Sequence, residues 1–241
     1  MPNTKIGGHY SQAYDEELQQ AVERLLQMAA LAQKQLRDAM TAFSTADLAL
    51  AKQVKQSDRK VNSFEVDIDE HCLDILARRQ PAATDLRLVL AILKSVNDVE
   101  RIGDMAKRIA KALLRALPDS RPSAMQLDTL NQMGQEVIQM FERAIAAFEQ
   151  MDAKAALAVL RDEKAIDSTY DTILQSSLAS MMQDTQQIAI SLQVSQVAKS
   201  LERVGDHCRN ICEQAIFISK GSHVAHLSDA ELQQIVDKSR D

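Results

Sequence analysis

Two carboxylates spaced four residues apart occur twice in this chain, inside the same short motif. Glu100-Arg-Ile-Gly-Asp104 recurs 102 residues later as Glu202-Arg-Val-Gly-Asp206. Residues four apart in an α-helix lie about 40° from each other, because each residue turns by about 100°. Each motif therefore presents two acids on one helix face. Clustered carboxylates suit hard cations such as Mg²⁺, Mn²⁺, Ca²⁺ or iron.

A second pair of oxygen-bearing side chains precedes each motif. Asp58 and Asn62 lie four residues apart in the first half, and Glu163 and Asp167 do so in the second half. If these segments are neighbouring helices of a bundle, each half offers four oxygen-bearing side chains to one cation. Asn62 can ligate through its amide oxygen but brings no charge.

The position of these acids on their helices bears on whether they are functional. Glu202 and Asp206 lie roughly 140–180° from the centre of the apolar stripe of their helix, and the acids of the preceding helix lie about 60–100° from theirs. The acids are therefore predicted to face a groove or an open surface rather than the interior. A solvated helix face is the simpler interpretation of such acids. Against it, like charges four residues apart destabilise a helix.

Two glycines accompany the acids. Gly103 and Gly205 lie inside the duplicated motifs, and a glycine within a helix costs about 1 kcal/mol relative to alanine. Their presence predicts a close approach of two backbones, or open space, beside the acids.

The motifs of common enzymes are missing from the sequence. It contains no nucleophile elbow, no Gly-rich phosphate loop and no HExxH motif. None of the five histidines follows an acid by three residues, which excludes a ferritin-like di-iron centre. Zinc is less favoured because His and Cys do not accompany the acids at ligand spacing. His207 adjoins Asp206 but points about 100° away on a helix, and Cys208 and Cys212 fall on an apolar stripe. We predict a protein that is not an enzyme; a metal-dependent hydrolase is the alternative that clustered carboxylates allow.

Composition indicates an all-helical protein of the cytoplasm. The 241 residues are 46% hydrophobic, include six Gly, four Pro and no Trp, and carry a net charge of −6. The negative charge argues against a nucleic-acid-binding surface. No apolar run approaches the roughly 20 residues that span a bilayer, and the first residues contain no signal-peptide core. Three cysteines fit a reducing compartment better than a disulfide framework.

Helical periodicity and chain breakers predict six long helices in two sets of three. Ser44-Thr45 is predicted to form a turn that caps the second helix, Pro81 to end that helix, and Asp152, Asp184 and Ser228 to cap later helices. The expected helices span residues 11–43, 46–79, 83–117, 124–149, 153–182 and 184–220. The fold class is therefore all-α, a tandem repeat of two three-helix bundles with six long antiparallel helices. The predicted domains are residues 9–117 and 124–220, joined by a linker at 118–123 and followed by a polar tail at 221–241.

The duplicated motifs, each in the third helix of a three-helix unit, resemble those of the PhoU family. Matching segments also surround Asp58 and Glu163, and the resemblance covers residues 11–220. It implies two metal sites, here Asp58, Asn62, Glu100 and Asp104 in the first half and Glu163, Asp167, Glu202 and Asp206 in the second. The metal would be Mg, Mn or Fe, with Zn less favoured. The first site is expected to bind more weakly because Asn62 replaces a carboxylate.

The resemblance also implies a biological role. Family members are negative regulators of the phosphate-starvation response and of high-affinity phosphate uptake. They connect the ATPase subunit of a phosphate ABC transporter to a membrane sensor histidine kinase. A cytoplasmic homodimer that associates peripherally with these membrane partners is the corresponding expectation. The alternative is a helical scaffold whose acidic faces bind partner proteins without a physiological metal.

Overall fold

The regular structure of the described residues is entirely helical. A computed structural model describes residues 12–116 and 121–238. Six long helices, one 3₁₀ turn and one short helix follow each other in these ranges: α1 (Gln12–Thr45), α2 (Leu48–Arg79), α3 (Ala83–Leu114), α4 (Ala124–Glu149), α5 (Ala153–Gln183), η1 (Thr185–Gln187), α6 (Ile188–Lys220) and α7 (Asp229–Asp237). The predicted all-α class is confirmed. Residues 117–120 of the expected linker lie outside the described residues.

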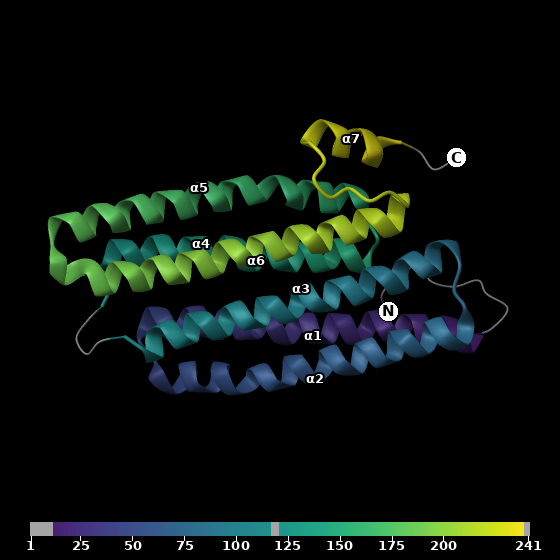
Figure 1. The fold of residues 1–241 in the computed structure, drawn as a ribbon, viewed down its shortest axis with the longest axis horizontal. Coiled ribbons are helices and arrows are strands. Elements are labelled where there is room, and N and C mark those ends of the chain that lie inside the picture. The colour runs from purple at the N-terminus through teal and green to yellow at the C-terminus, as the bar shows by residue number, and fades with distance from the viewer. Residues whose placement is uncertain (1–11, 117–120, 239–241) are drawn as a thin grey trace.

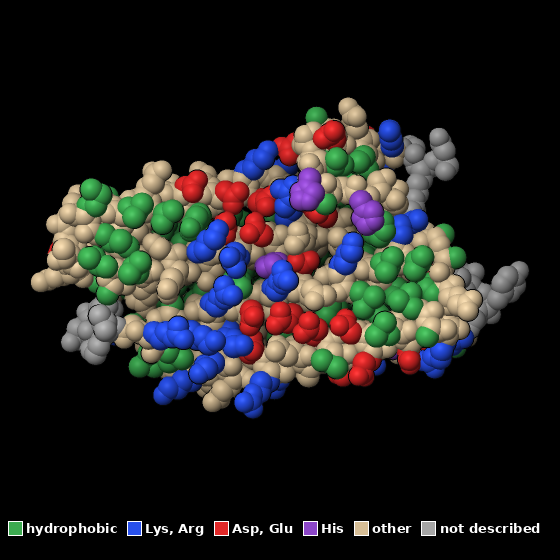
Figure 2. Space-filling view, viewed as in Figure 1, with side chains coloured by type: hydrophobic (Ala, Val, Ile, Leu, Met, Phe, Trp, Pro, Cys, Tyr) green, Lys and Arg blue, Asp and Glu red, His purple; other side chains and the backbone are tan. Residues whose placement is uncertain are grey.

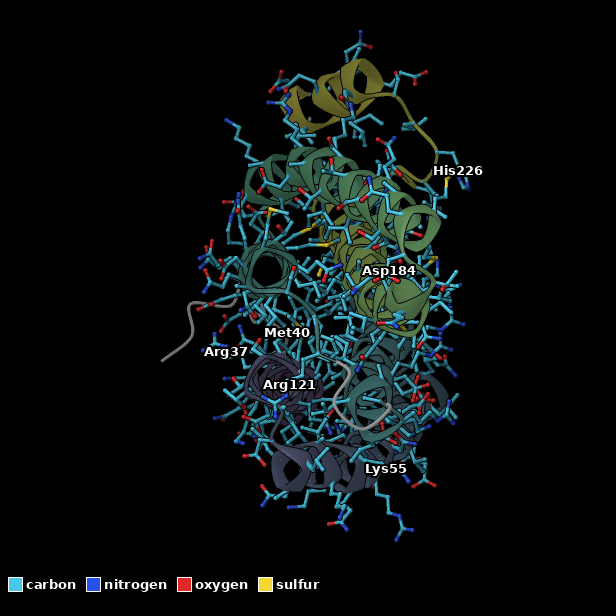
Figure 3. The ribbon with its side chains drawn as sticks, turned by 90° about the vertical axis from the view of Figure 1, so that its left-hand side faces the viewer. Arg37, Met40, Lys55, Arg121, Asp184 and His226 are labelled. Atoms are coloured by element: carbon cyan, nitrogen blue, oxygen red, sulfur yellow. The ribbon has the colours of Figure 1, made fainter. Side chains whose placement is uncertain are left out.

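The long helices form two three-helix bundles that lie side by side along their length (Figure 1). Helices α1–α3 make one bundle and α4–α6 make the other. Viewed from one end, α1 lies against α4 across the junction between the bundles, and α3 lies against α6 beside them (Figure 3). Helices α2 and α5 are the outermost of the six and contact only their own bundle or the C-terminal elements. The junction between the two halves is therefore built from α1, α3, α4 and α6.

The corner between the first two helices of each bundle is duplicated in atomic detail. Asp47 caps α2 by accepting hydrogen bonds from the backbone N–H groups of Ala49 and Leu50, each at 2.9 Å. Asp152, 105 residues later, caps α5 by accepting from Lys154 and Ala155. The residue before each cap has a left-handed backbone conformation, with φ of 55° at Ala46 and 50° at Met151. The internal repeat thus extends beyond the acidic motifs to the turns.

Most predicted helix ends agree with the structure, and three differ. The caps at Asp152 and Ser228 are confirmed. Ser44 and Thr45 are not a turn, because both belong to the last turn of α1 and bond to backbone carbonyls four residues earlier. Helix α3 ends at Leu114 rather than at residue 117. Asp184 caps the 3₁₀ turn that precedes α6 rather than α6 itself.

Aliphatic side chains, with a few methionines and phenylalanines, form one continuous core through both bundles. The predicted burial of Cys208 and Cys212 is confirmed, and Cys72 is buried as well. At the junction, the backbone of Gly134 on α4 lies against Met40 on α1, and a Cβ at Gly134 would come within 2.8 Å of the Met40 Cε atom. No helix among the described residues combines the length and the apolar character that a membrane span requires.

The glycines of the acidic motifs face the other helices of their bundle: Gly103 faces α1 and α2, and Gly205 faces α5. A Cβ at Gly103 would lie 3.1 Å from Gln35 Oε1 and 3.5 Å from Val61 Cγ1, so this glycine does permit a close approach. A Cβ at Gly205 would lie 3.6 Å from two side-chain carbons of Ile166, which is an ordinary van der Waals contact. At neither glycine does the structure show the predicted close approach of another backbone. Gly103 instead makes room for the Gln35 side chain, and Gly205 has ordinary contacts.

This difference predicts that alanine stabilises the protein more at position 205 than at position 103. We expect Gly205→Ala to raise the free energy of unfolding by up to about 1 kcal/mol, because alanine favours the helix and fits beside Ile166. Gly103→Ala should gain less or nothing, because its methyl group presses on the Gln35 amide. Chemical denaturation of the two variants tests this; destabilisation by Gly205→Ala would contradict it.

Candidate metal centres on two duplicated helix pairs

The acidic motif of the first half lies along the seam between α2 and α3. Asp58 on α2 is buried, with 5% of its surface exposed. The Lys107 ammonium on α3 donates to Asp58 Oδ2 at 2.5 Å and to Asp104 Oδ1 at 3.3 Å. Lys107 therefore joins one carboxylate from each of the two predicted pairs.

Further acids on α2, which the sequence analysis did not assign, enlarge this first cluster. Glu65 and Asp69 follow Asp58 at helical spacing. Glu65 lies near Glu100 and Asp104 of α3, and Asp69 lies near Glu65. Burial raises the pKa of Glu100, and the negative charges of Asp104, Glu65 and Asp58 raise it further. Burial and the charge of Asp69 likewise raise the pKa of Glu65. The i, i+4, i+7, i+11 spacing of Asp58, Asn62, Glu65 and Asp69 was the signal that could have identified the larger cluster.

The second half repeats the arrangement between α5 and α6. Glu163 is buried, with 8% of its surface exposed, and Arg209 donates to its Oε2 at 2.5 Å. Arg209 occupies the position that corresponds to Lys107, 102 residues later. On the other side of the motif, the Lys199 ammonium donates to Glu202 Oε1 at 2.6 Å. Each half thus has a cation bound to the buried acid of its second helix.

The burial of Asp58 and Glu163 corrects, for these two acids, the expectation that the acids face a groove or an open surface. Both acids lie on the flank of their helix, at the point where α3 or α6 packs beside it. The charged ends of Lys107 and Arg209 bind Asp58 and Glu163, respectively. Asn62 and Asp167, one turn further along, are exposed as predicted, and so is Asp206.

The carboxylates of the second cluster also raise each other's pKa values. Burial raises the pKa of Asp206, and the charges of Glu202 and Asp167 add to the effect. For Asp167 the causes are again burial and then the charge of Glu202. Burial raises the pKa of Glu163 even though Arg209 opposes this change. The negative charges are therefore close enough to repel, and the cations present do not neutralise them fully.

Two carboxylate oxygens in these clusters are buried without a hydrogen-bond donor. They are Glu202 Oε2 in the second cluster and Asp69 Oδ1 in the first. A buried carboxylate oxygen without a partner is costly, and a cation would satisfy it. Nevertheless, no three acids, histidines or cysteines among the described residues converge closely enough, as the side chains are placed, to surround a metal. The donor chemistry fits a hard cation, and Lys199 and Arg209 occupy oxygens that such a cation would need.

Both clusters open on the same face of the molecule. Figure 2 shows acidic side chains gathered over the α2–α3 seam and over the α5–α6 seam, with Lys and Arg side chains between the two groups. The two predicted sites are therefore separate centres on one surface. The structure does not bring the eight residues together into a single site.

A buried polar network that the sequence does not predict joins the two halves. Asp98 on α3 is 9% exposed; its Oδ1 accepts from His207 Nδ1 and from the Asn210 amide on α6, both at 2.9 Å. The sequence places His207 directly after Asp206 but gives no sign of a contact with Asp98, 109 residues earlier. Asp98 belongs to none of the duplicated motifs, because its counterpart 102 residues later is Ser200.

Two three-helix repeats with an acidic face on each third helix define a class of duplicated helical-bundle proteins. The family model described as "PhoU domain" matches residues 25–113 and 130–215. The chain is 42% identical to the phosphate-specific transport system accessory protein PhoU homolog of Pseudomonas putida, over 91% of this chain and 85% of that protein. It is 36% identical to the phosphate-specific transport system accessory protein PhoU of Escherichia coli (strain K12), over 98% of this chain and 97% of that protein.

A solved structure agrees with these sequence matches. The crystal structure of PhoU from Pseudomonas aeruginosa superposes with a TM-score of 0.80 at 39% sequence identity, covering 87% of this chain and 100% of that one. The chain belongs to the PhoU family.

The network around Asp98 predicts a measurable role in stability. Asp98→Ala should lower the free energy of unfolding by about 1–3 kcal/mol, because it leaves His207 and Asn210 without their shared acceptor. Asp74→Ala is the matched control. It removes an exposed acid whose partner Arg78 lies one turn away on the same helix, and it should change the stability by less than about 0.5 kcal/mol. Equal effects of the two substitutions in urea denaturation would contradict the assignment.

Proposed function

We propose that this chain is a non-enzymatic regulator of phosphate homeostasis that represses the phosphate-starvation response and limits high-affinity phosphate uptake. The observation that carries the proposal is family membership through both repeats. Relatives matched over 85% and 97% of their length are named accessory proteins of the phosphate-specific transport system or homologs of them. The partners would be the ATPase subunit of the phosphate ABC transporter and a membrane sensor histidine kinase. This role places the protein in the cytoplasm, at the inner surface of the membrane.

Duplicated apolar surfaces support a role in binding other proteins. Leu90 on α3 and its counterpart Leu192 on α6 are 39% and 52% exposed. Leu86 and its counterpart Ile188 are also exposed, and so are Leu73 and its counterpart Leu178. Each set lies where the second and third helices of a bundle meet. Exposed aliphatic side chains that recur in both halves are typical of interaction surfaces, and a homodimer or the two membrane partners could use them.

The metal is a second part of the proposal. In the second half, Glu163, Asp167, Glu202 and Asp206 would hold a hard cation such as Mg²⁺, Mn²⁺ or iron. In the first half, Asp58, Asn62, Glu100 and Asp104 would do so with help from Glu65. The cation would neutralise carboxylates that now repel each other and would satisfy the free oxygen of Glu202. Its role would be to fix the acidic face in one shape for a partner.

Loss of the gene tests the regulatory role. Its deletion should make phosphate-scavenging genes constitutive, measured with a reporter for a starvation-induced promoter in phosphate-replete medium. Expression of the intact chain should restore repression. Unchanged repression in the deletion strain would refute the proposed role whatever the outcome for the metal.

Calorimetry with Mn²⁺ and Mg²⁺ tests the metal separately. Glu202→Gln/Asp206→Asn should remove most of the binding heat, and Glu100→Gln/Asp104→Asn a smaller part, because Asn62 weakens the first site. Asp67→Asn/Glu70→Gln removes two exposed acids from α2 and is the control for net charge. Wild-type binding by the first variant would favour the alternative, a scaffold whose acidic faces bind proteins without metal. In that case partner binding should survive chelators and weaken with salt.

A further inference from the structure

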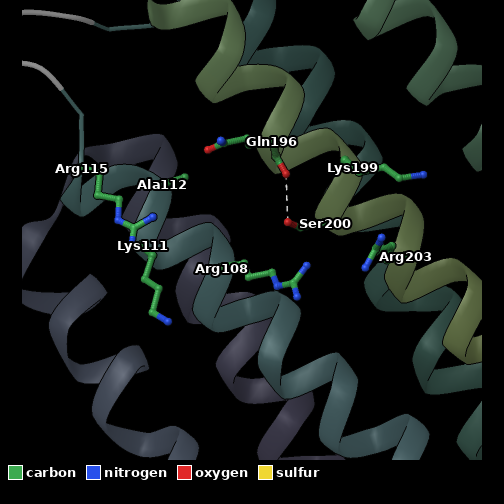
Figure 4. Close-up of a pocket in the computed structure, with 8 residues that line it drawn as sticks. All are labelled: Arg108, Lys111, Ala112, Arg115, Gln196, Lys199, Ser200 and Arg203. Atoms are coloured by element: carbon green, nitrogen blue, oxygen red, sulfur yellow. Dashed lines mark hydrogen bonds between the residues drawn. The ribbon is translucent and has the colours of Figure 1, made fainter.

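A cleft between α3 and α6 is lined by basic side chains. It lies at the junction of the two bundles, near the C-terminal end of α3, and has a volume of about 300 Å³. Figure 4 shows that its walls come from both helices and that Arg108 extends from α3 toward α6. We call it the basic cleft; its lining residues are Arg108, Lys111, Ala112 and Arg115 of α3 and Gln196, Lys199, Ser200 and Arg203 of α6.

The positive charge of the basic cleft is not balanced by the protein. Five of the eight lining residues are Lys or Arg, and none is acidic. Lys199 binds Glu202, and its ammonium lies over the Tyr170 ring. No carboxylate among the described residues pairs with any of the other four cations. Such a concentration of charge is unexpected in a chain whose net charge is −6.

In the internal repeat, the positions equivalent to the basic cleft carry acidic side chains as well as basic ones. The equivalent of an α3 residue lies 102 residues later, on α6, and the equivalent of an α6 residue lies 102 residues earlier, on α3. These positions lie where Asp98 meets His207 and Asn210. There Asp98 stands in place of Ser200, Asn210 in place of Arg108, and Glu213 in place of Lys111. Asp98 binds His207 and Asn210, and Glu213 binds Arg209. The protein supplies its own anions at that place and supplies none in the basic cleft.

A second basic groove lies close by and strengthens the positive field. Lys52, Lys55 and Arg59 on α2 line it together with Leu114, which is one residue from Arg115 of the basic cleft. Figure 2 shows Lys and Arg side chains gathered over this part of the surface. Neighbouring clefts of one charge attract anions from solution and raise their local concentration.

We propose that the basic cleft binds a small molecule that carries at least two phosphate groups. Arginine forms paired hydrogen bonds with phosphate oxygens, and three arginines line the cleft. A compact ligand must bring several negative charges into about 300 Å³, and linked phosphate groups do this more densely than carboxylates. An acidic protein surface would spread its charges over a wider area than the eight residues that line this cleft. Inorganic triphosphate and a nucleoside triphosphate share the required chemistry.

The experiment measures binding of sodium triphosphate and of ATP to the full-length protein by calorimetry. EDTA is present, so a metal at the acidic clusters cannot bridge to the phosphates. Arg108→Gln/Arg203→Gln should weaken triphosphate binding by roughly tenfold or more, since each lost charge-assisted hydrogen bond corresponds to about that factor. The matched control is Lys94→Gln/Arg101→Gln, which removes the same charge at the equivalent place on α3 and should bind within about twofold to threefold of wild type.

Further arms identify what is recognised. Equal affinity for triphosphate and ATP would assign recognition to the phosphate groups, and tighter ATP binding would add a contact with the nucleoside; both support the proposal. Orthophosphate that binds as tightly as triphosphate would overturn the requirement for two phosphates. A short polyglutamate peptide that binds as tightly would overturn the choice of ligand. Absence of triphosphate binding would overturn the site itself. So would an equal loss of triphosphate affinity in Arg108→Gln/Arg203→Gln and in the control Lys94→Gln/Arg101→Gln. Since no metal or partner protein is involved, these outcomes do not depend on the proposed regulatory function.

Discussion

The packing of α3 against α6 is the contact on which the rest of the molecule depends. These two helices carry the acidic motifs of both halves, and their contact forms much of the junction between the bundles. At one part of the contact Asp98 binds His207 and Asn210; at another, Gln193 donates to the backbone carbonyl of Ala112. Buried polar groups of this kind stabilise a structure only when they meet their partners, so they favour one register of the two helices. That register puts both acidic clusters on one face.

In the acidic clusters, carboxylates repel each other and the neighbouring cations neutralise only part of their charge. Lys107 and Arg209 bind the buried acids Asp58 and Glu163, whereas the acids nearer the surface remain close to one another. Burial and like charges both penalise the ionised carboxylates, as the raised pKa values show. A bundle that only needed stability would replace some of these acids with neutral residues or with further cations. The structure therefore keeps a local electrostatic cost that an external cation or a basic partner would relieve.

Much of the fold could be predicted from the sequence because periodicity and breakers are local signals. The six helices, the caps at Asp152 and Ser228 and the internal repeat could be read directly. The burial of Asp58 and Glu163 could not, because it depends on how closely α3 packs against α2 and α6 against α5, where Lys107 and Arg209 bind these two acids. The partners of His207 were also hidden, since Asp98 is 109 residues away in the chain. The unbalanced charge of the basic cleft could be recognised only by comparing the two repeats and by seeing which side chains lie near each other in space.

Lys199 connects the two sites proposed for this molecule. Its ammonium binds Glu202 in the second acidic cluster, and the same residue lines the basic cleft. A metal ion bound by Glu202 would repel this ammonium and take over its oxygen, which frees Lys199 to contact an anion in the cleft. An anion that attracts Lys199 would, conversely, release Glu202 for the metal. Such coupling is reciprocal in binding free energy. Through the shared Lys199, each ligand would therefore raise the affinity of the protein for the other.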